Sequence, residues 1–203
     1  MDELIKNIVY SSIINLFKNQ PDIFENTDQT NFTEWNLSYH LSNEIAKYIF
    51  WLNVDLDVTK RNYQNRRPDI IFHKRNTNAL NFLVVELKKS KNDNASDINK
   101  IIEDWMRKPL NYRYGVYINI WGKGEYRAVV LKGVQRYEVT ESCNYVKMPK
   151  INNHLLMQYQ KLTNDISSKK NSENSENSEN TLNEIINLID NIVLRTYESN
   201  LSI

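Results

Sequence analysis

The chain contains little cysteine, histidine and glycine, and each shortage excludes a class of protein. Cys143 is the single cysteine among 203 residues, so no disulfide can form within the chain. The three histidines are scattered and have no zinc-ligand spacing. With 4 glycines, the chain has no Gly-rich loop to cradle phosphates. The sequence therefore argues against a disulfide framework, a zinc centre and a nucleotide-triphosphate enzyme.

Long apolar runs and a strong net charge are also missing. No apolar run reaches the roughly 18 residues of a membrane span. The first residues, MDELIKNIVYSS, are acidic where a signal peptide would be positive. We therefore expect a soluble, cytoplasmic protein with no membrane partner. The net charge of +1 means that any surface for nucleic acid must be a local one.

The stretch 66–91 reads RRPDIIFHKRNTNALNFLVVELKKSK and organises the rest of the chain. It holds two short apolar runs, 70–72 and 82–85, which are rich in β-branched and aromatic residues. Asn, Thr and basic residues bound both runs, so the pattern predicts two neighbouring strands joined by a turn at 76–81.

Charged residues stand at the ends of these two predicted strands. Asp69 opens the first strand, and Glu86 and Lys88 close the second on one face while Leu87 points to the other. In a hairpin, Asp69, Glu86 and Lys88 converge. A divalent metal would offset the cost of burying the carboxylates, and Mg²⁺ takes one or two carboxylates together with phosphate oxygens. The set suits phosphodiester hydrolysis, and the alternative is a surface hairpin with solvated charged ends.

The chain has Pro68-Asp69, then sixteen intervening residues, then Glu86-Leu87-Lys88. This order resembles the motif of the PD-(D/E)XK nuclease superfamily. The segments RRPDIIFHKR and NFLVVELKKS are similar to those of one branch of this superfamily, which consists of small bacterial and archaeal proteins. The resemblance covers roughly 33–120. It implies an α/β fold with a restriction-endonuclease-like αβββαβ core, whose mixed central sheet is flanked by helices, with extra N- and C-terminal helices. It also implies a metal-dependent nuclease, with Mg²⁺ or Mn²⁺ as cofactor and nucleic acid, DNA foremost, as partner.

The resemblance also implies a role for each site residue. Asp69 and Glu86 would ligate the metal together with the backbone carbonyl of Leu87, and Lys88 would orient the attacking water or stabilise the transition state. The family's first core helix supplies an acidic residue to the metal site, where it would add a carboxylate ligand or help to orient a metal-bound water. TEWNLSYHL is similar to the opening of that helix and selects Glu34, while Glu44 is the alternative. Each glutamate could equally be an exposed helix carboxylate, and Glu34 an acid favoured by the helix dipole.

Three basic residues are candidates for contacts to phosphate. Arg66 and Arg67 belong to the basic stretch KRNYQNRR at 60–67, which could grip phosphates or serve as a solvated connection. Lys100 ends the motif Asp-Ile-Asn-Lys, which resembles a short motif at the start of the helix that follows the catalytic strand in the family. A helix-surface lysine is the alternative interpretation there.

The remaining pattern predicts one domain over 1–163 with terminal additions. A polar stretch at 164–180 contains three Asn-Ser-Glu repeats and is expected to be a disordered linker. A final apolar helix is expected within 181–203, either docked on the domain or forming a homodimer.

The other expected helices lie at 2–18, 34–50, 96–107 and 152–162. Thr33 is expected to cap the second of these, with a Phe32–Leu37 hydrophobic staple, and Ser96 to cap the third. The other expected strands lie at 53–58, 112–120, 125–131 and 133–139.

Three functions therefore stay open. The first is a metal-dependent nuclease. The second is a non-catalytic module that keeps the nuclease fold and binds nucleic acid or protein. The third is a structural or assembly protein that uses its terminal helices as oligomerisation arms.

Overall fold

The computed structural model describes residues 1–25, 33–60, 65–92, 95–169 and 175–198. The helical elements are α1 (Asp2–Asn19), the 3₁₀ helix η1 (Pro21–Phe24), α2 (Glu34–Ala46), α3 (Ala95–Asp104), α4 (Asn153–Lys169) and α5 (Ser175–Glu198). The strands are β1 (Asn53–Leu56), β2 (Ile70–His73), β3 (Asn81–Lys88), β4 (Tyr114–Gly122), β5 (Glu125–Lys132) and β6 (Gln135–Val139).

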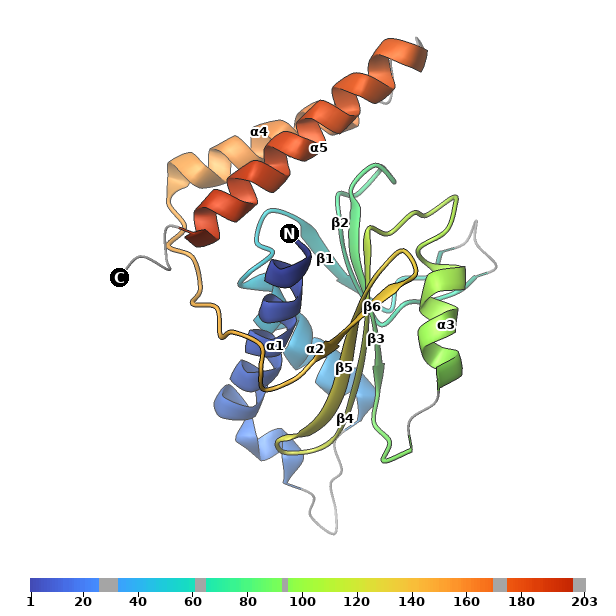
Figure 1. The fold of residues 1–203 in the computed structure, drawn as a ribbon, viewed down its shortest axis with the longest axis vertical. Helices are drawn as coiled ribbons and strands as arrows, with labels where there is room; N and C mark the ends of the chain where they lie inside the picture. The colour runs from blue at the N-terminus through green and yellow to red at the C-terminus, as the bar shows by residue number, and fades with distance from the viewer. Residues whose placement is uncertain (26–32, 61–64, 93–94, 170–174, 199–203) are drawn as a thin grey trace.

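The strands form one six-stranded mixed sheet in the order of the sequence, β1-β2-β3-β4-β5-β6 (Figure 1). Four of the five pairings are antiparallel, and β3 pairs with β4 in parallel. A parallel pair needs a crossover connection, and α3 lies within it. The expected α/β class, with a mixed sheet flanked by helices, is confirmed.

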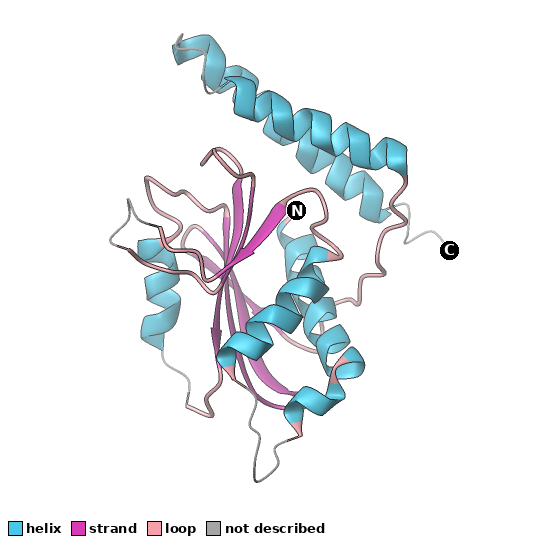
Figure 2. Cartoon of the chain, turned by 180° about the vertical axis from the view of Figure 1, so that it is seen from behind, coloured by secondary structure: helices cyan, strands magenta, loops and turns pink. Residues whose placement is uncertain are grey.

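Helices cover both faces of the sheet (Figure 2). Side chains alternate along β3, so Leu83, Val85 and Leu87 join the core under α1 and α2. Val84 points to the opposite face, into a smaller core that α3 completes with Ile101. Because β3 is covered on both faces, its run is apolar throughout rather than alternating.

Gly115 of β4 sets how closely α3 approaches the sheet. A Cβ at this position would lie 2.5 Å from the side chain of Ile101 and 2.8 Å from the sulfur of Met106. The missing side chain therefore lets α3 pack directly on β4. This matters for the site below, because α3 brings Lys100 toward the end of β3 and leads directly into Trp105.

Helices α4 and α5 lie side by side across one end of the molecule (Figure 1). The hydroxyl of Tyr197 donates a hydrogen bond to the backbone carbonyl of Tyr48, and Arg113 pairs with Asp190. The apolar face of α5 is buried in the main core through Ile185, Ile189, Ile192, Val193 and Tyr197. Docking on the domain, one of the two placements expected for this helix, is observed. The homodimer stays a prediction.

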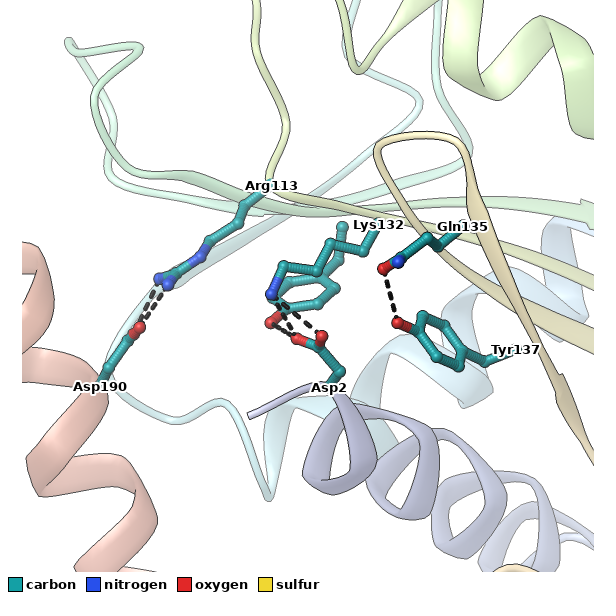
Figure 3. A network of polar contacts seen from close by, with 7 residues as sticks. Asp2, Arg113, Lys132, Gln135, Tyr137 and Asp190 are labelled. Atoms are coloured by element: carbon teal, nitrogen blue, oxygen red, sulfur yellow. Dashed lines mark hydrogen bonds and ion pairs between the residues drawn. The ribbon is translucent and has the colours of Figure 1, made fainter.

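A polar network fixes both chain-terminal elements to the sheet (Figure 3). Asp2, in the first turn of α1, accepts hydrogen bonds of 2.7 Å from the hydroxyl of Tyr114 and from Nζ of Lys132. Next to it, Nη1 of Arg113 donates a 2.8 Å hydrogen bond to Asp190 of α5. Helices α1 and α5 are therefore both anchored where β4 begins and β5 ends.

Several predicted helix ends differ from the structure. Thr33 caps α2 as expected, because its side chain accepts a hydrogen bond from the backbone N–H of Asn36. Phe32 lies outside the described residues, so the predicted staple has no structural description. Helix α2 ends at Ala46 rather than near residue 50, although the apolar residues beyond it are still buried. Helix α3 begins at Ala95, so Ser96 lies inside it and the predicted cap is wrong.

The predicted linker also differs from the structure. Helix α4 continues to Lys169, and α5 begins at Ser175, so residues 164–169 and 175–180 are helical. Composition suggested disorder because this stretch cannot form a core of its own. The two helices instead pack against each other, and α4 buries Ile166 in the main core, so tertiary packing stabilises the polar end of α4. Residues 170–174 of the predicted linker lie outside the described residues.

No helix in the described part of the chain combines the length and apolarity needed to cross a membrane.

Candidate active site

Asp69 and Glu86 face each other across neighbouring strands. Ile70 pairs with Val85 in the β2–β3 register, so the residues immediately beyond this pair, Asp69 and Glu86, lie opposite each other. Strand alternation puts Glu86 on the α3 face with Val84, and Asp69 on that face with Ile71. The hairpin brings together the two carboxylates that the sequence singled out, Asp69 half-buried and Glu86 buried.

One hydrogen bond fixes the orientation of each carboxylate. The backbone N–H of Leu87 donates to Oδ2 of Asp69 at 2.6 Å. The indole N–H of Trp105 donates to Oε1 of Glu86 at 2.7 Å. Each of these bonds uses a single oxygen, and a carboxylate offers acceptor positions on both. The arrangement therefore holds the two groups in place without using all their lone pairs.

Burial changes the acidity of both groups. Burial raises the pKa of Asp69, although the Leu87 N–H and the Lys88 ammonium act in the opposite direction. Burial and the neighbouring Asp69 carboxylate raise the pKa of Glu86 to about 7, against the opposing effects of Trp105, Lys100 and Lys88. Two like charges held close together favour keeping a proton on one of them. Such a pair gains from a bound cation.

Glu34 reaches the same end of the sheet from the N-terminus of α2. Its Oε1 accepts a 3.2 Å hydrogen bond from the backbone N–H of Lys89. Its Oε2 lies 3.9 Å from Nζ of Lys88. The Glu34 carboxylate also acts to raise the pKa of Asp69. Glu34, Asp69, Glu86 and Lys88 therefore occupy one site, although they come from three different elements.

Glu44, the alternative helix carboxylate, lies away from this site. It is 4 % exposed, and its Oε1 accepts hydrogen bonds from Nζ of Lys47 and from the side chain of Asn19. Asn19 ends α1, so Glu44 belongs to the contact between α1 and α2. The structure thus separates the two candidates, and only Glu34 lies near Asp69.

The three predicted phosphate contacts line one cavity. Arg66, Arg67 and Lys100 surround a hollow of about 710 Å³ between α3 and the segment before β2, and Trp105 lines it too. Both arginines have acidic partners: Arg66 pairs with Asp104, and Nη1 of Arg67 lies 3.3 Å from Asp57. Through Trp105, the cavity adjoins Glu86.

Sequence reasoning missed three residues of this region. Trp105 and Asp104 fall within the helix expected at 96–107, and neither was given a functional role. Asn119 lies beside Lys88 on β4; its Oδ1 accepts from the N–H of Ser90, and its Nδ2 is buried with no hydrogen-bond partner among the described residues. A buried indole N–H needs an acceptor, so Trp105 was the one residue that could have been linked to a carboxylate from sequence.

The carboxylate oxygens at this site could ligate a hard divalent cation, although few side chains supply them. Mg²⁺ requires only one or two protein carboxylates, because waters and substrate oxygens complete its octahedron. Asp69 and Glu86 would supply these two. Over the described ranges, no group of three or more His, Cys, Asp or Glu side chains is arranged to hold a metal ion. The predicted role of the Leu87 carbonyl stays a prediction, since the observed contact uses the Leu87 N–H.

Comparison of the chain with family models, with curated proteins and with solved structures found no match.

Proposed function

We propose that this protein is a metal-dependent nuclease that hydrolyses phosphodiester bonds, with DNA as the foremost substrate. The observation that carries the proposal is the convergence of three carboxylates and a lysine at the end of β3. Asp69, immediately before β2, faces Glu86 of β3, and Lys88 and Glu34 complete the group. Carboxylates with raised pKa values beside a cation are typical of catalytic sites.

The order of the elements supports the same proposal. From α2 to β4 the chain runs helix, three strands, helix, strand. This is the order of the αβββαβ core that the PD-(D/E)XK resemblance implies, and we propose a restriction-endonuclease-like core on that basis. The additions at either end, α1 and the pair α4–α5, lie outside this core.

In the proposed reaction, Asp69 and Glu86 would hold the cofactor, Mg²⁺ or Mn²⁺. A bound cation of this kind lowers the pKa of a water molecule and neutralises charge on the phosphate. Lys88 orients the attacking water or stabilises the charge that develops on the phosphorane. Glu34 keeps Lys88 and the turn after β3 in position through its two contacts. Attack is in line with the leaving oxygen.

Substrate phosphates would enter through the cavity beside α3. Lys100 is exposed there, and Arg66 and Arg67 lie at the same opening. Each arginine has five N–H donors in a fork, so an acidic partner uses only part of its capacity. Asp57 and Asp104 thus orient these arginines, which can still contact phosphate.

The test is cleavage of a labelled panel of single-stranded, duplex, flap and four-way-junction DNA, together with RNA. We expect cutting in Mg²⁺ or Mn²⁺, none in excess chelator, and none by the Asp69→Ala variant. Circular dichroism would verify that the variant is folded. Absence of cleavage on every substrate by folded wild-type protein would contradict the proposal.

A non-catalytic binding module that keeps the fold is the second candidate. The observation that favours it is the absence, within the described ranges, of a three-residue metal-ligand group. Such a module would bind nucleic acid or a protein partner equally well with and without Mn²⁺. An affinity that is independent of the metal, in a protein that cuts nothing, would select this candidate.

A further inference from the structure

Two aromatic side chains on α2 are exposed next to the candidate active site. Trp35 is 63 % exposed and Tyr39 46 % exposed. They stand four residues apart on the helix, so they are neighbours on its surface. Their ring centroids lie 6.1 Å apart, and the ring planes differ by 13°. The pair therefore presents two nearly parallel rings to solvent.

Packing of α2 does not require these rings. The helix buries Leu37, Leu41 and Ile45 against the main core, and all three are fully buried. A large apolar side chain is informative when it is exposed beside another one, because burial of the exposed apolar surface would be favourable. The rings thus have an energetic reason to bind an aromatic or apolar partner.

Their position connects them to the site. Trp35 directly follows Glu34, which contacts the backbone of Lys89 and the ammonium of Lys88. Helix α2 therefore begins beside the end of β3, as Figure 2 also shows. The cavity lined by Arg66 and Lys100 lies by α3, on the opposite face of the sheet. The start of α2 and this cavity therefore flank the end of β3 from opposite faces of the sheet.

We propose, on the basis of the nuclease function above, that Trp35 and Tyr39 form a stacking surface for unpaired bases of the substrate. Every base has a π-face, and base–aromatic stacking is tolerant of sequence. Lys88, Lys89 and Lys91 follow one another where β3 ends and supply positive charge for the sugar–phosphate backbone of the same strand. The rings cannot reach bases that are stacked in a duplex. The preferred substrate is therefore a nucleic acid with a single-stranded segment, such as a flap or a free strand.

Binding without cleavage gives the most direct test. In excess chelator, fluorescence anisotropy would measure the Kd of wild-type protein for a labelled single-stranded oligonucleotide and for a blunt duplex of the same sequence. We expect Trp35→Ala/Tyr39→Ala to weaken single-strand binding roughly 10- to 100-fold. Duplex binding should change by less than about three-fold, which is within 1 kcal/mol.

Two further variants serve as controls. Trp35→Phe/Tyr39→Phe keeps the rings and should keep single-strand affinity, which would exclude a general effect of altering α2. Met157→Ala removes an exposed apolar side chain from α4 and should leave affinity unchanged. Thermal unfolding of each variant would establish that it is folded.

The outcomes separate this proposal from the nuclease proposal. Unchanged single-strand affinity in the alanine double variant would overturn the stacking surface, whether or not the wild-type protein cleaves. Lost affinity in a protein that cleaves nothing would support the stacking surface and refute the nuclease. Wild-type protein that binds no nucleic acid in chelator and cleaves none in Mg²⁺ or Mn²⁺ would overturn both.

Discussion

Three features of its surroundings determine the acidity of Glu86: burial, a neighbouring carboxylate and one hydrogen bond. It is 7 % exposed, its carboxylate faces that of Asp69, and one of its oxygens accepts the Trp105 N–H. Burial and the neighbouring negative charge both penalise ionisation, and a single hydrogen bond does not offset them. A carboxyl group held in this way is costly to the folded protein at neutral pH unless a cation is present.

This cost predicts how Glu86→Gln changes the pH dependence of stability. In the native state Glu86 has a pKa of about 7, against 4.5 for an ordinary glutamate. Between these values the native protein binds more protons than the unfolded chain, so the wild-type free energy of unfolding falls as pH rises from about 4.5 to 7. The variant cannot ionise and keeps an acceptor for Trp105. We expect it to equal wild type near pH 4.5 and to exceed it by up to roughly 3 kcal/mol at pH 8.

Urea unfolding in the presence of chelator, at both pH values, would measure this difference. Glu44→Gln serves as a matched control, because that carboxylate is also buried but lies at the contact between α1 and α2. An equal pH dependence in wild type and Glu86→Gln would show that Glu86 ionises normally.

At the scale of single residues, the sequence predicted which side chains converge but not what holds them. Alternation along a strand is a local rule, and it correctly predicted that Lys88 lies close enough to Glu86 to affect the acidity of that carboxyl group. The contact of Trp105 with Glu86 joins residues nineteen positions apart in different elements. This contact depends on how closely α3 approaches the sheet, and therefore on Gly115. The periodicity of apolar residues in the sequence does not predict that role of Gly115.

At the scale of elements, strands were predicted more accurately than helix ends. The strands expected at 112–120 and 125–131 appear as β4 and β5, and the β2–β3 pair appears where the apolar runs and the turn at 76–81 placed it. Helix α4 runs to Lys169, beyond the predicted end at 162, because its stability comes from packing against α5. Neighbouring residues in the sequence carry no sign of such a long-range contact.

The ion pair of Arg113 with Asp190 is predicted to stabilise the docking of α5. The pair is largely shielded from solvent, with side chains 31 % and 16 % exposed. Asp190→Asn leaves the guanidinium without its counter-charge, and we expect a loss of about 1–2 kcal/mol in the free energy of unfolding. The more exposed pair of Arg127 with Glu138 provides the control.

Denaturant unfolding would compare Asp190→Asn with Glu138→Gln, for which we expect less than about 0.5 kcal/mol. A loss of the same size in both variants would mean that Asp190 acts as an ordinary surface charge. It would also mean that the apolar face of α5 is sufficient for docking.

At the scale of the whole molecule, the fold determines where the charged side chains gather, which the small net charge does not show. The net charge of +1 gives no general attraction to nucleic acid. The fold instead gathers Arg66, Arg67 and Lys100 around one cavity, which Glu103 and Asp104 also line, and the end of β3 adds Lys88 nearby. Affinity for a phosphate backbone would therefore come from one region, as the sequence required of any nucleic-acid binder.

Metal binding should be visible as a change in the stability of the whole protein. A ligand that binds only the folded state stabilises it by about 2.7 kcal/mol at one hundred times its Kd. We expect Mn²⁺ to raise the Tm of wild type and of Glu44→Gln, and to leave the Tm of Asp69→Asn unchanged. Calorimetric scans over a Mn²⁺ titration would measure this. An equal rise in all three proteins would place the metal elsewhere.

The most direct test of the central claim is the rate at which Lys88→Ala cleaves a labelled flap or single-stranded DNA in Mn²⁺, beside wild type. Lys123→Ala removes the same charge from the exposed turn between β4 and β5 and is the matched control. If Lys88 acts on the attacking water or the phosphorane, its loss should lower the rate by roughly a hundred-fold or more, while Lys123→Ala cuts as wild type does. Cleavage by Lys88→Ala at the wild-type rate would contradict the proposed site.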